Sequence, residues 1–146
     1  MTRIKISQLK QKTRAYRAFS KKEWALVHPE HFGTRKDKRY WENLPVILVA
    51  KDGGKIVGTL SGSLMGGVLY IATLMVAHDA RGSGIGATLL KQAEAYARGH
   101  KGHRAYLETG VGWRAVGFYE KLGYKPEAKL RDFYEHKDFW VMTKRL

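Results

Sequence analysis

Arg81-Gly82-Ser83-Gly84-Ile85-Gly86 is the stretch that decides the fold of this 146-residue chain. It follows an apolar, β-branched run at residues 69–76, which predicts a strand, and it precedes apolar residues at helical spacing. Three glycines at alternate positions remove side chains from the turn that enters the helix. Backbone N–H groups at such a helix start can converge on an anion, helped by the helix dipole. The stretch therefore predicts a phosphate-binding loop.

Three strands are expected before this loop, in an antiparallel meander. Residues 45–50 form an apolar run, and residues 51–55 contain the turn pair Gly-Gly. Residues 56–64 return, residues 65–67 turn again, and residues 68–76 form the third strand.

A mixed sheet is expected after the loop. Apolar residues recur at helical spacing over 85–97, and residues 104–109 have the pattern of a strand. A strand, a helix and a strand in succession predict a parallel crossover. A second helix over 113–122 is then followed by a pair of strands at 124–130 and 139–143.

The N-terminal third is less regular. Residues 3–6 alternate polar and apolar residues, which predicts a short strand, and Ser7 is the expected N-cap of an amphipathic helix. The apolar residues of that helix are Leu9, Tyr16 and Phe19. Residues 23–43 predict a helix, a loop and a short helix, and this segment is the expected substrate-facing wall.

Length and composition favour a single domain over residues 1–146, large enough to bury a core without covalent links. There is no cysteine, which excludes disulfides, a thiolate nucleophile and a cysteine-based metal site. No apolar run approaches the about 20 residues of a membrane span, and the first residues lack the apolar core of a secretory signal. A cytoplasmic protein without a membrane partner is expected.

The charge is strongly positive, with 27 Lys and Arg against 13 acidic residues, a formal +14. Such an excess predicts attraction to polyanions, either nucleic acid or a multiply phosphorylated cofactor. Solubility alone explains the charge equally well, so the charge names no substrate.

Two common phosphate-binding motifs do not fit the loop. The dinucleotide fingerprint requires G-x-G-x-x-G early in a βαβ unit, whereas these glycines alternate and follow three expected strands. The P-loop requires Gly-Lys-Ser/Thr, which is absent here.

The chain resembles the GNAT superfamily of acyl-CoA-dependent N-acetyltransferases over nearly its whole length. Residues 81–86 match the family's Arg/Gln-x-x-Gly-x-Gly/Ala pyrophosphate loop. The later segment Phe118-Tyr119-Glu120-Lys121-Leu122-Gly123-Tyr124 matches its Tyr-Glu-Lys-Leu-Gly-Phe/Tyr segment. The resemblance implies an α/β (α+β) protein with the GNAT fold: a mixed six- to seven-stranded sheet, splayed at its centre, with about four flanking helices.

The resemblance also implies acetyl-CoA as co-substrate, and no metal. Backbone groups of the strand before the loop would hydrogen-bond the pantetheine arm, and the Val76 N–H would polarise the acetyl carbonyl. Amides of the loop would hold the pyrophosphate. The implied donor-binding residues are Leu74, Met75, Val76, Arg81, Gly82, Ser83, Gly84, Ile85, Gly86, Ala87 and Tyr119.

Two residues are candidates for the proton transfers that attack by an amine requires. Tyr119 occupies the position at which family members protonate the departing sulfur; the alternative is a half-buried helix tyrosine. Glu108 lies where some members carry a base acting through water; the alternative is a salt bridge. One departure concerns Gly112, where many members have an asparagine that touches the pantetheine.

The expected function is therefore acetyl transfer from acetyl-CoA to a primary amine: a protein N-terminus, a lysine or a small amine. The alternative is a catalytically inactive CoA-binding or nucleic-acid-associated module with the same fold. Candidates for an acidic acceptor groove are Glu23, Glu30, Glu42 and Glu108. Edge strands in the C-terminal half predict a possible homodimer.

Overall fold

The computed structural model describes residues 4–33 and 38–146. The chain separates into two compact units, Met1–Lys38 and Arg39–Leu146, and each is described by itself. The expected single domain spans both units and stays a prediction. None of the helices in the described residues combines the length and apolarity that a membrane crossing requires.

The N-terminal unit contains the helix α1, Arg14–Phe32. The Thr13 side chain caps it by accepting a hydrogen bond of 3.1 Å from the Tyr16 N–H. Gly33, at φ +70°, ends it. The prediction of a helix capped by Ser7 is wrong, because the cap is provided by Thr13, six residues later.

Two further N-terminal predictions need correction. Residues 4–6 form no strand, since no neighbouring strand pairs with them in the described chain, and Arg3 lies outside the described residues. Residues 23–32 continue α1 rather than starting a new helix. The expected loop at 34–37 lies outside the described residues, and the short helix is the 3-10 turn Lys38–Trp41.

The predicted meander is confirmed in the larger unit. It consists of β1 (Leu44–Asp52), β2 (Lys55–Met65) and β3 (Val68–Val76), each antiparallel to the next. The turns use the Gly-Gly pairs, and Gly53, Gly66 and Gly67 have positive φ values.

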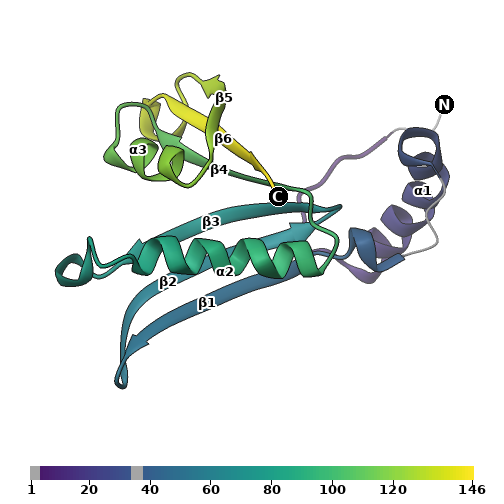
Figure 1. Ribbon diagram of the computed structural model, residues 1–146. Helices are drawn as coiled ribbons and strands as arrows, with labels where there is room; N and C mark the ends of the chain where they lie inside the picture. Colours follow the sequence, from purple (N-terminus) through teal and green to yellow (C-terminus); the bar gives the residue numbers. More distant parts are fainter. Residues whose placement is uncertain (1–3, 34–37) are drawn as a thin grey trace. The chain divides into compact units, whose positions relative to one another are not determined.

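The parallel crossover is confirmed as well. Helix α2 (Ile85–Gly99) connects β3 to β4 (Arg104–Gly110), which is parallel to β3. Helix α3 (Arg114–Lys121) follows, and the antiparallel pair β5 (Lys125–Leu130) and β6 (Phe139–Arg145) ends the chain. Figure 1 shows this arrangement.

The result is one mixed sheet of six strands in the order β1-β2-β3-β4-β6-β5, which agrees with the expected fold class. Three α-helices are described instead of about four. Helix α2 lies along the meander (Figure 1) and buries Leu89, Leu90, Ala93 and Ala97 in the core.

The sheet splays between β3 and β4, as expected. The two strands pair only through residues 68–70 and 104–106. In β3, Ala72 is an extra residue between the pairs Ser61–Thr73 and Gly62–Ile71, so the strand bulges. A Cβ atom on Gly62 would lie 2.1 Å from the Tyr70 carbonyl oxygen, so this bulge requires glycine. Beyond the three pairs the strands separate (Figure 1).

A buried ion pair joins α2 to β6, at Lys144, which lies opposite Ala105 of β4. The Glu94 carboxylate on α2 is 2% exposed. It accepts hydrogen bonds of 3.0 and 2.8 Å from Lys144 Nζ, and one of 3.1 Å from the Tyr124 hydroxyl. Arg98 lies 3.6 Å away. Because the carboxylate is fully partnered, it connects the helix to the C-terminal strands without an uncompensated charge.

Glu94→Ala should lower the free energy of unfolding by about 3 kcal/mol, because it leaves Lys144 and the Tyr124 hydroxyl without their buried acceptor. Urea denaturation measures this value. The matched control is Glu120→Ala, an exposed glutamate on α3, which should change it by less than about 0.5 kcal/mol. Equal effects of the two changes would show that the ion pair stabilises nothing.

Candidate functional site

The glycine loop leaves bare backbone at the start of α2. Gly82 and Gly84 have φ values of +78° and +82°, which glycine adopts without strain. A Cβ atom built on either would meet no atom within 4 Å, so the loop is open on that side. The first amides of the 15-residue helix have no acceptor within the helix, and they lie at its positive end. The arrangement suits an anion.

Gly86 has a different structural role from Gly82 and Gly84. It lies inside α2, where a Cβ atom would come within 3.3 Å of Phe118 Cζ and 3.4 Å of Val76 Cγ2. Its missing side chain lets the first turn of α2 pack against β3 and α3 together. Reasoning from the sequence treated the three glycines alike.

Side chains of the loop fasten it to neighbouring backbone. Arg81 Nε donates to the Val76 carbonyl at 3.4 Å, and the Ser83 hydroxyl donates to the Ala80 carbonyl. The loop is thereby tied to the end of β3.

The end of β3 offers backbone groups without a strand partner on the β4 side. Among the described residues, β3 pairs with β4 only through residues 68–70, so Leu74, Met75 and Val76 lie past the last pair. Backbone groups released in this way can bind a ligand that lies along the strand.

Tyr119 is a buried tyrosine of α3, 9% exposed. Its ring packs edge-on against Phe118 and Tyr124, and burial raises the pKa of its hydroxyl. Within the described chain the hydroxyl forms no hydrogen bond, yet it is not sealed from solvent. The protonated Tyr119 side chain therefore lies beside Phe118, and Phe118 lies next to Gly86 at the end of the glycine loop.

Glu108 is a half-buried residue of β4 with one specific partner. The Tyr70 hydroxyl on β3 donates a hydrogen bond of 2.9 Å to Glu108 Oε2. Burial and this hydrogen bond raise the pKa of Tyr70 to about 12. The Tyr70 ring also stacks on Tyr106, with centroids 4.8 Å apart.

Sequence reasoning missed Tyr70. The signal lay in the crossover, because a parallel pair places Tyr70 opposite Tyr106, two residues before Glu108 on the same face. The structure does not join the two candidate catalytic residues: in the described chain no hydrogen bond links Glu108 to Tyr119. Glu108 interacts with Tyr70, whereas Tyr119 packs against Phe118.

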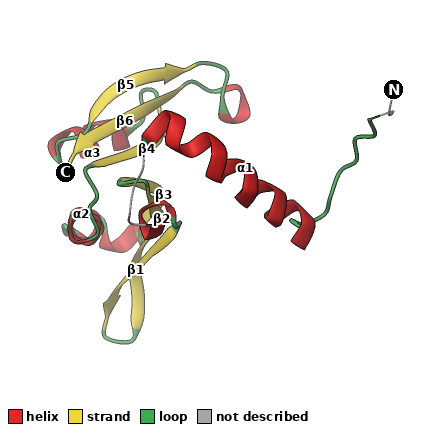
Figure 2. Cartoon of the chain, turned by 90° about the vertical axis from the view of Figure 1, so that its right-hand side faces the viewer, coloured by secondary structure: helices red, strands yellow, loops and turns green. Residues whose placement is uncertain are grey.

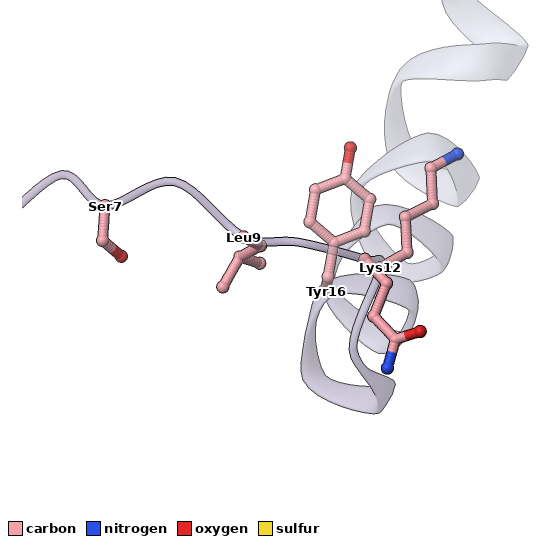
Figure 3. Close-up of a pocket in the computed structure, with 5 residues that line it drawn as sticks. Ser7, Leu9, Lys12 and Tyr16 are labelled. Atoms are coloured by element: carbon pink, nitrogen blue, oxygen red, sulfur yellow. The ribbon is translucent and has the colours of Figure 1, made fainter.

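A surface hollow and a search for metal ligands add no residue to this site. Figure 3 shows a hollow lined by Ser7, Leu9, Gln11, Lys12 and Tyr16, all from the N-terminal unit and none of them a candidate residue. Over residues 4–33 and 38–146, no three His, Asp or Glu side chains gather as a metal site.

Comparison with known proteins identifies the family. Residues 13–124 match the model of the Acetyltransferase (GNAT) family. The chain belongs to the GNAT acetyltransferases. The blasticidin-S acetyltransferase of Streptomyces morookaense is 36% identical over 80 residues, which are 52% of this chain and 59% of that protein. This chain thus covers less than two thirds of that relative.

Solved structures of acetyltransferases share the fold. An acetyltransferase from Bacillus cereus is 25% identical, with a TM-score of 0.71 over 96% of this chain and 98% of that one. A GNAT family acetyltransferase from Elizabethkingia anophelis, solved with acetyl-CoA bound, has a TM-score of 0.65 at 20% identity over 70% of this chain and 76% of that one. The resemblance inferred from the two motifs is confirmed.

Glu108→Gln should lower the pKa of Tyr70 from about 12 toward, but not to, its ordinary value of 10.0, since burial is the larger cause and remains. NMR of ring-labelled tyrosine between pH 9 and pH 12.5 follows this ionisation. Tyr124, whose pKa is raised by burial and by Glu94, is the internal control and should not move. An unchanged Tyr70 titration would exclude coupling to Glu108.

Proposed function

We propose that this GNAT protein transfers the acetyl group of acetyl-CoA to a primary amine by direct attack. The observation that carries the proposal is the open glycine loop at the start of α2, beside a strand whose end is released from its neighbour. This combination suits a long donor with a diphosphate at one end. Family membership supports the same activity.

The chain's own groups fit such a donor. Amides of residues 81–87 hold the diphosphate at the helix start. Backbone groups of Leu74, Met75 and Val76 bind the pantetheine arm, and the Val76 N–H polarises the acetyl carbonyl. Because these contacts use backbone, the Leu74 side chain remains free to pack against the core, whereas Met75 is 62% exposed. Acetyl-CoA supplies the activated thioester.

The reaction forms a bond between the amine nitrogen and the acetyl carbon and breaks the carbon–sulfur bond of the thioester. Two proton transfers accompany it. Glu108 takes the proton that the amine must lose, through a water molecule, and Tyr119 gives a proton to the leaving sulfur. Burial raises the pKa of Tyr119, so its hydroxyl, like that of an ordinary tyrosine, carries a proton to give at neutral pH. The Tyr70 hydrogen bond supports the role of Glu108 by holding its carboxylate.

Two partner expectations remain predictions. The polyanion partner rests on the +14 charge. The homodimer rests on β5, which forms one edge of the sheet. The inactive CoA-binding module is the competing function, and the presence of both Tyr119 and Glu108 argues against it.

Saturating acetyl-CoA should raise the thermal midpoint of the protein, since ligand at 100 times Kd adds about 2.7 kcal/mol of stability. Gly84→Val should abolish this rise, because a branched side chain is strained at φ +82° and stands in the open face of the loop. Gly54→Ala, in a turn with open space around it, is the control and should keep the rise.

Measuring the release of CoA in the presence of different amines then distinguishes the acetyltransferase from the inactive CoA-binding module. A thermal shift without transfer to any class of amine would favour the inactive module. No shift at millimolar acetyl-CoA would overturn both.

Tyr119→Phe should lower kcat by about 100-fold or more, because it removes the proton donor to sulfur. Its Kd for acetyl-CoA, measured by calorimetry, should stay near that of the unchanged protein. Tyr96→Phe, a tyrosine on the outer side of α2, is the matched control. Full turnover of Tyr119→Phe would remove this residue as the acid.

A further inference from the structure

A group of aromatic side chains, three of them exposed around the buried Phe139, lies where β4 ends and β6 begins, on the strand that carries Glu108. This aromatic patch consists of Trp113, Phe133, Tyr134 and Phe139. Its rings are in continuous contact, with centroids 4.5 Å apart for Phe133 and Tyr134, 5.2 Å for Tyr134 and Phe139, and 5.3 Å for Trp113 and Phe139. Trp113 and Tyr134 are each 56% exposed. Phe139, which contacts all three of the other rings, is buried beneath them. Exposed aromatic side chains gathered in this way are typical of a binding site.

Sheet register connects the aromatic patch to Glu108. Phe139 pairs with Gly110, and Glu108 lies two residues before Gly110, on the same face of β4. From the other side, Tyr134 lies near enough to Tyr70 to contribute to its raised pKa. The aromatic patch and the Tyr70–Glu108 pair therefore adjoin one another.

The loop that carries Tyr134 is held in a fixed, strained shape. It joins β5 to β6 (Figure 2), and three of its non-glycine residues have φ values between +50° and +58°: Asp132, Glu135 and His136. Hydrogen bonds within the loop hold it, including His136 Nδ1 to Asp132 Oδ1 at 2.7 Å. Strain of this kind is retained where a fixed side-chain position is useful.

The same loop is acidic in a basic protein. Residues 132–138 contain three of the chain's 13 acidic residues, Asp132, Glu135 and Asp138, against one lysine, Lys137, in a chain of formal charge +14. With Glu108, they make this part of the larger unit more favourable for a single cation than for an anion. The surrounding positive charge opposes a long polycation.

We propose that the acceptor is a small primary amine carried on an aromatic or heteroaromatic ring. The ring stacks on the aromatic patch, and its ammonium group reaches Glu108 and the faces of Tyr70 and Tyr106. This proposal rests on the proposed acetyl transfer and specifies its substrate class.

Three amines of graded chemistry test this class: 2-phenylethylamine, n-hexylamine and spermidine. The kcat/KM for phenylethylamine should exceed that for hexylamine by at least 10-fold and that for spermidine by more. Tyr134→Ala should raise KM for phenylethylamine about 10-fold and reduce the preference, while Tyr134→Phe should retain it. The acetyl-CoA Kd should not change, and Tyr96→Ala serves as the control. Equal use of hexylamine, or preference for spermidine or a peptide N-terminus, would overturn the proposal.

Calorimetric binding of phenylethylamine separates this proposal from the proposed function. Binding that weakens in Tyr134→Ala and in Glu108→Gln, without acetyl transfer in the unchanged protein, would support the aromatic patch and contradict the acetyltransferase. Transfer to phenylethylamine with binding unaffected by Tyr134→Ala would contradict the aromatic patch and leave the acetyltransferase standing.

Discussion

The separation of β3 from β4 is the constraint on which the larger unit depends. Only three residue pairs join these two central strands, and the Ala72 bulge turns β3 away from its neighbour. A continuous sheet would have paired the backbone of residues 74–76 with β4 and left nothing for a ligand. The fold thus gives up hydrogen bonds at the centre of its sheet, and the backbone groups that it releases are the ones we propose to bind the donor.

Because only three pairs join β3 to β4, side-chain interactions on both faces of the sheet stabilise the junction between these strands. On the helix face, Glu94 joins α2 to Lys144 of β6 and to Tyr124. On the opposite face, Tyr70 of β3 bonds to Glu108 of β4 and stacks on Tyr106. The residues of this second link are also candidates for the acceptor site. The same side chains would therefore both hold the two strands together and bind the amine.

The meander and the crossover could be predicted from the sequence, because apolar patterns and glycine turns act over short distances. The family, and with it the splay, followed from the resemblance of residues 81–86 and 118–124 to known motifs. It failed in the N-terminal third, where Ser7 and Thr13 are both acceptable caps and only the structure distinguishes them. It also missed Tyr70 and the aromatic patch. Their meaning depends on pairings between distant segments, such as Phe139 with Gly110, which no local pattern encodes.

The loop between β5 and β6 is fastened mainly to itself. Asp132 bonds to His136 and, through its N–H, to Asp138, and the Phe133 N–H bonds to the Lys137 carbonyl. The glycine loop at residues 81–86 lies more than forty residues earlier in the chain. Residues 131–138 could therefore be replaced as one unit without disturbing residues 81–87. With the roles proposed above, such a replacement would change the range of amines and leave the contacts to the thioester unaltered.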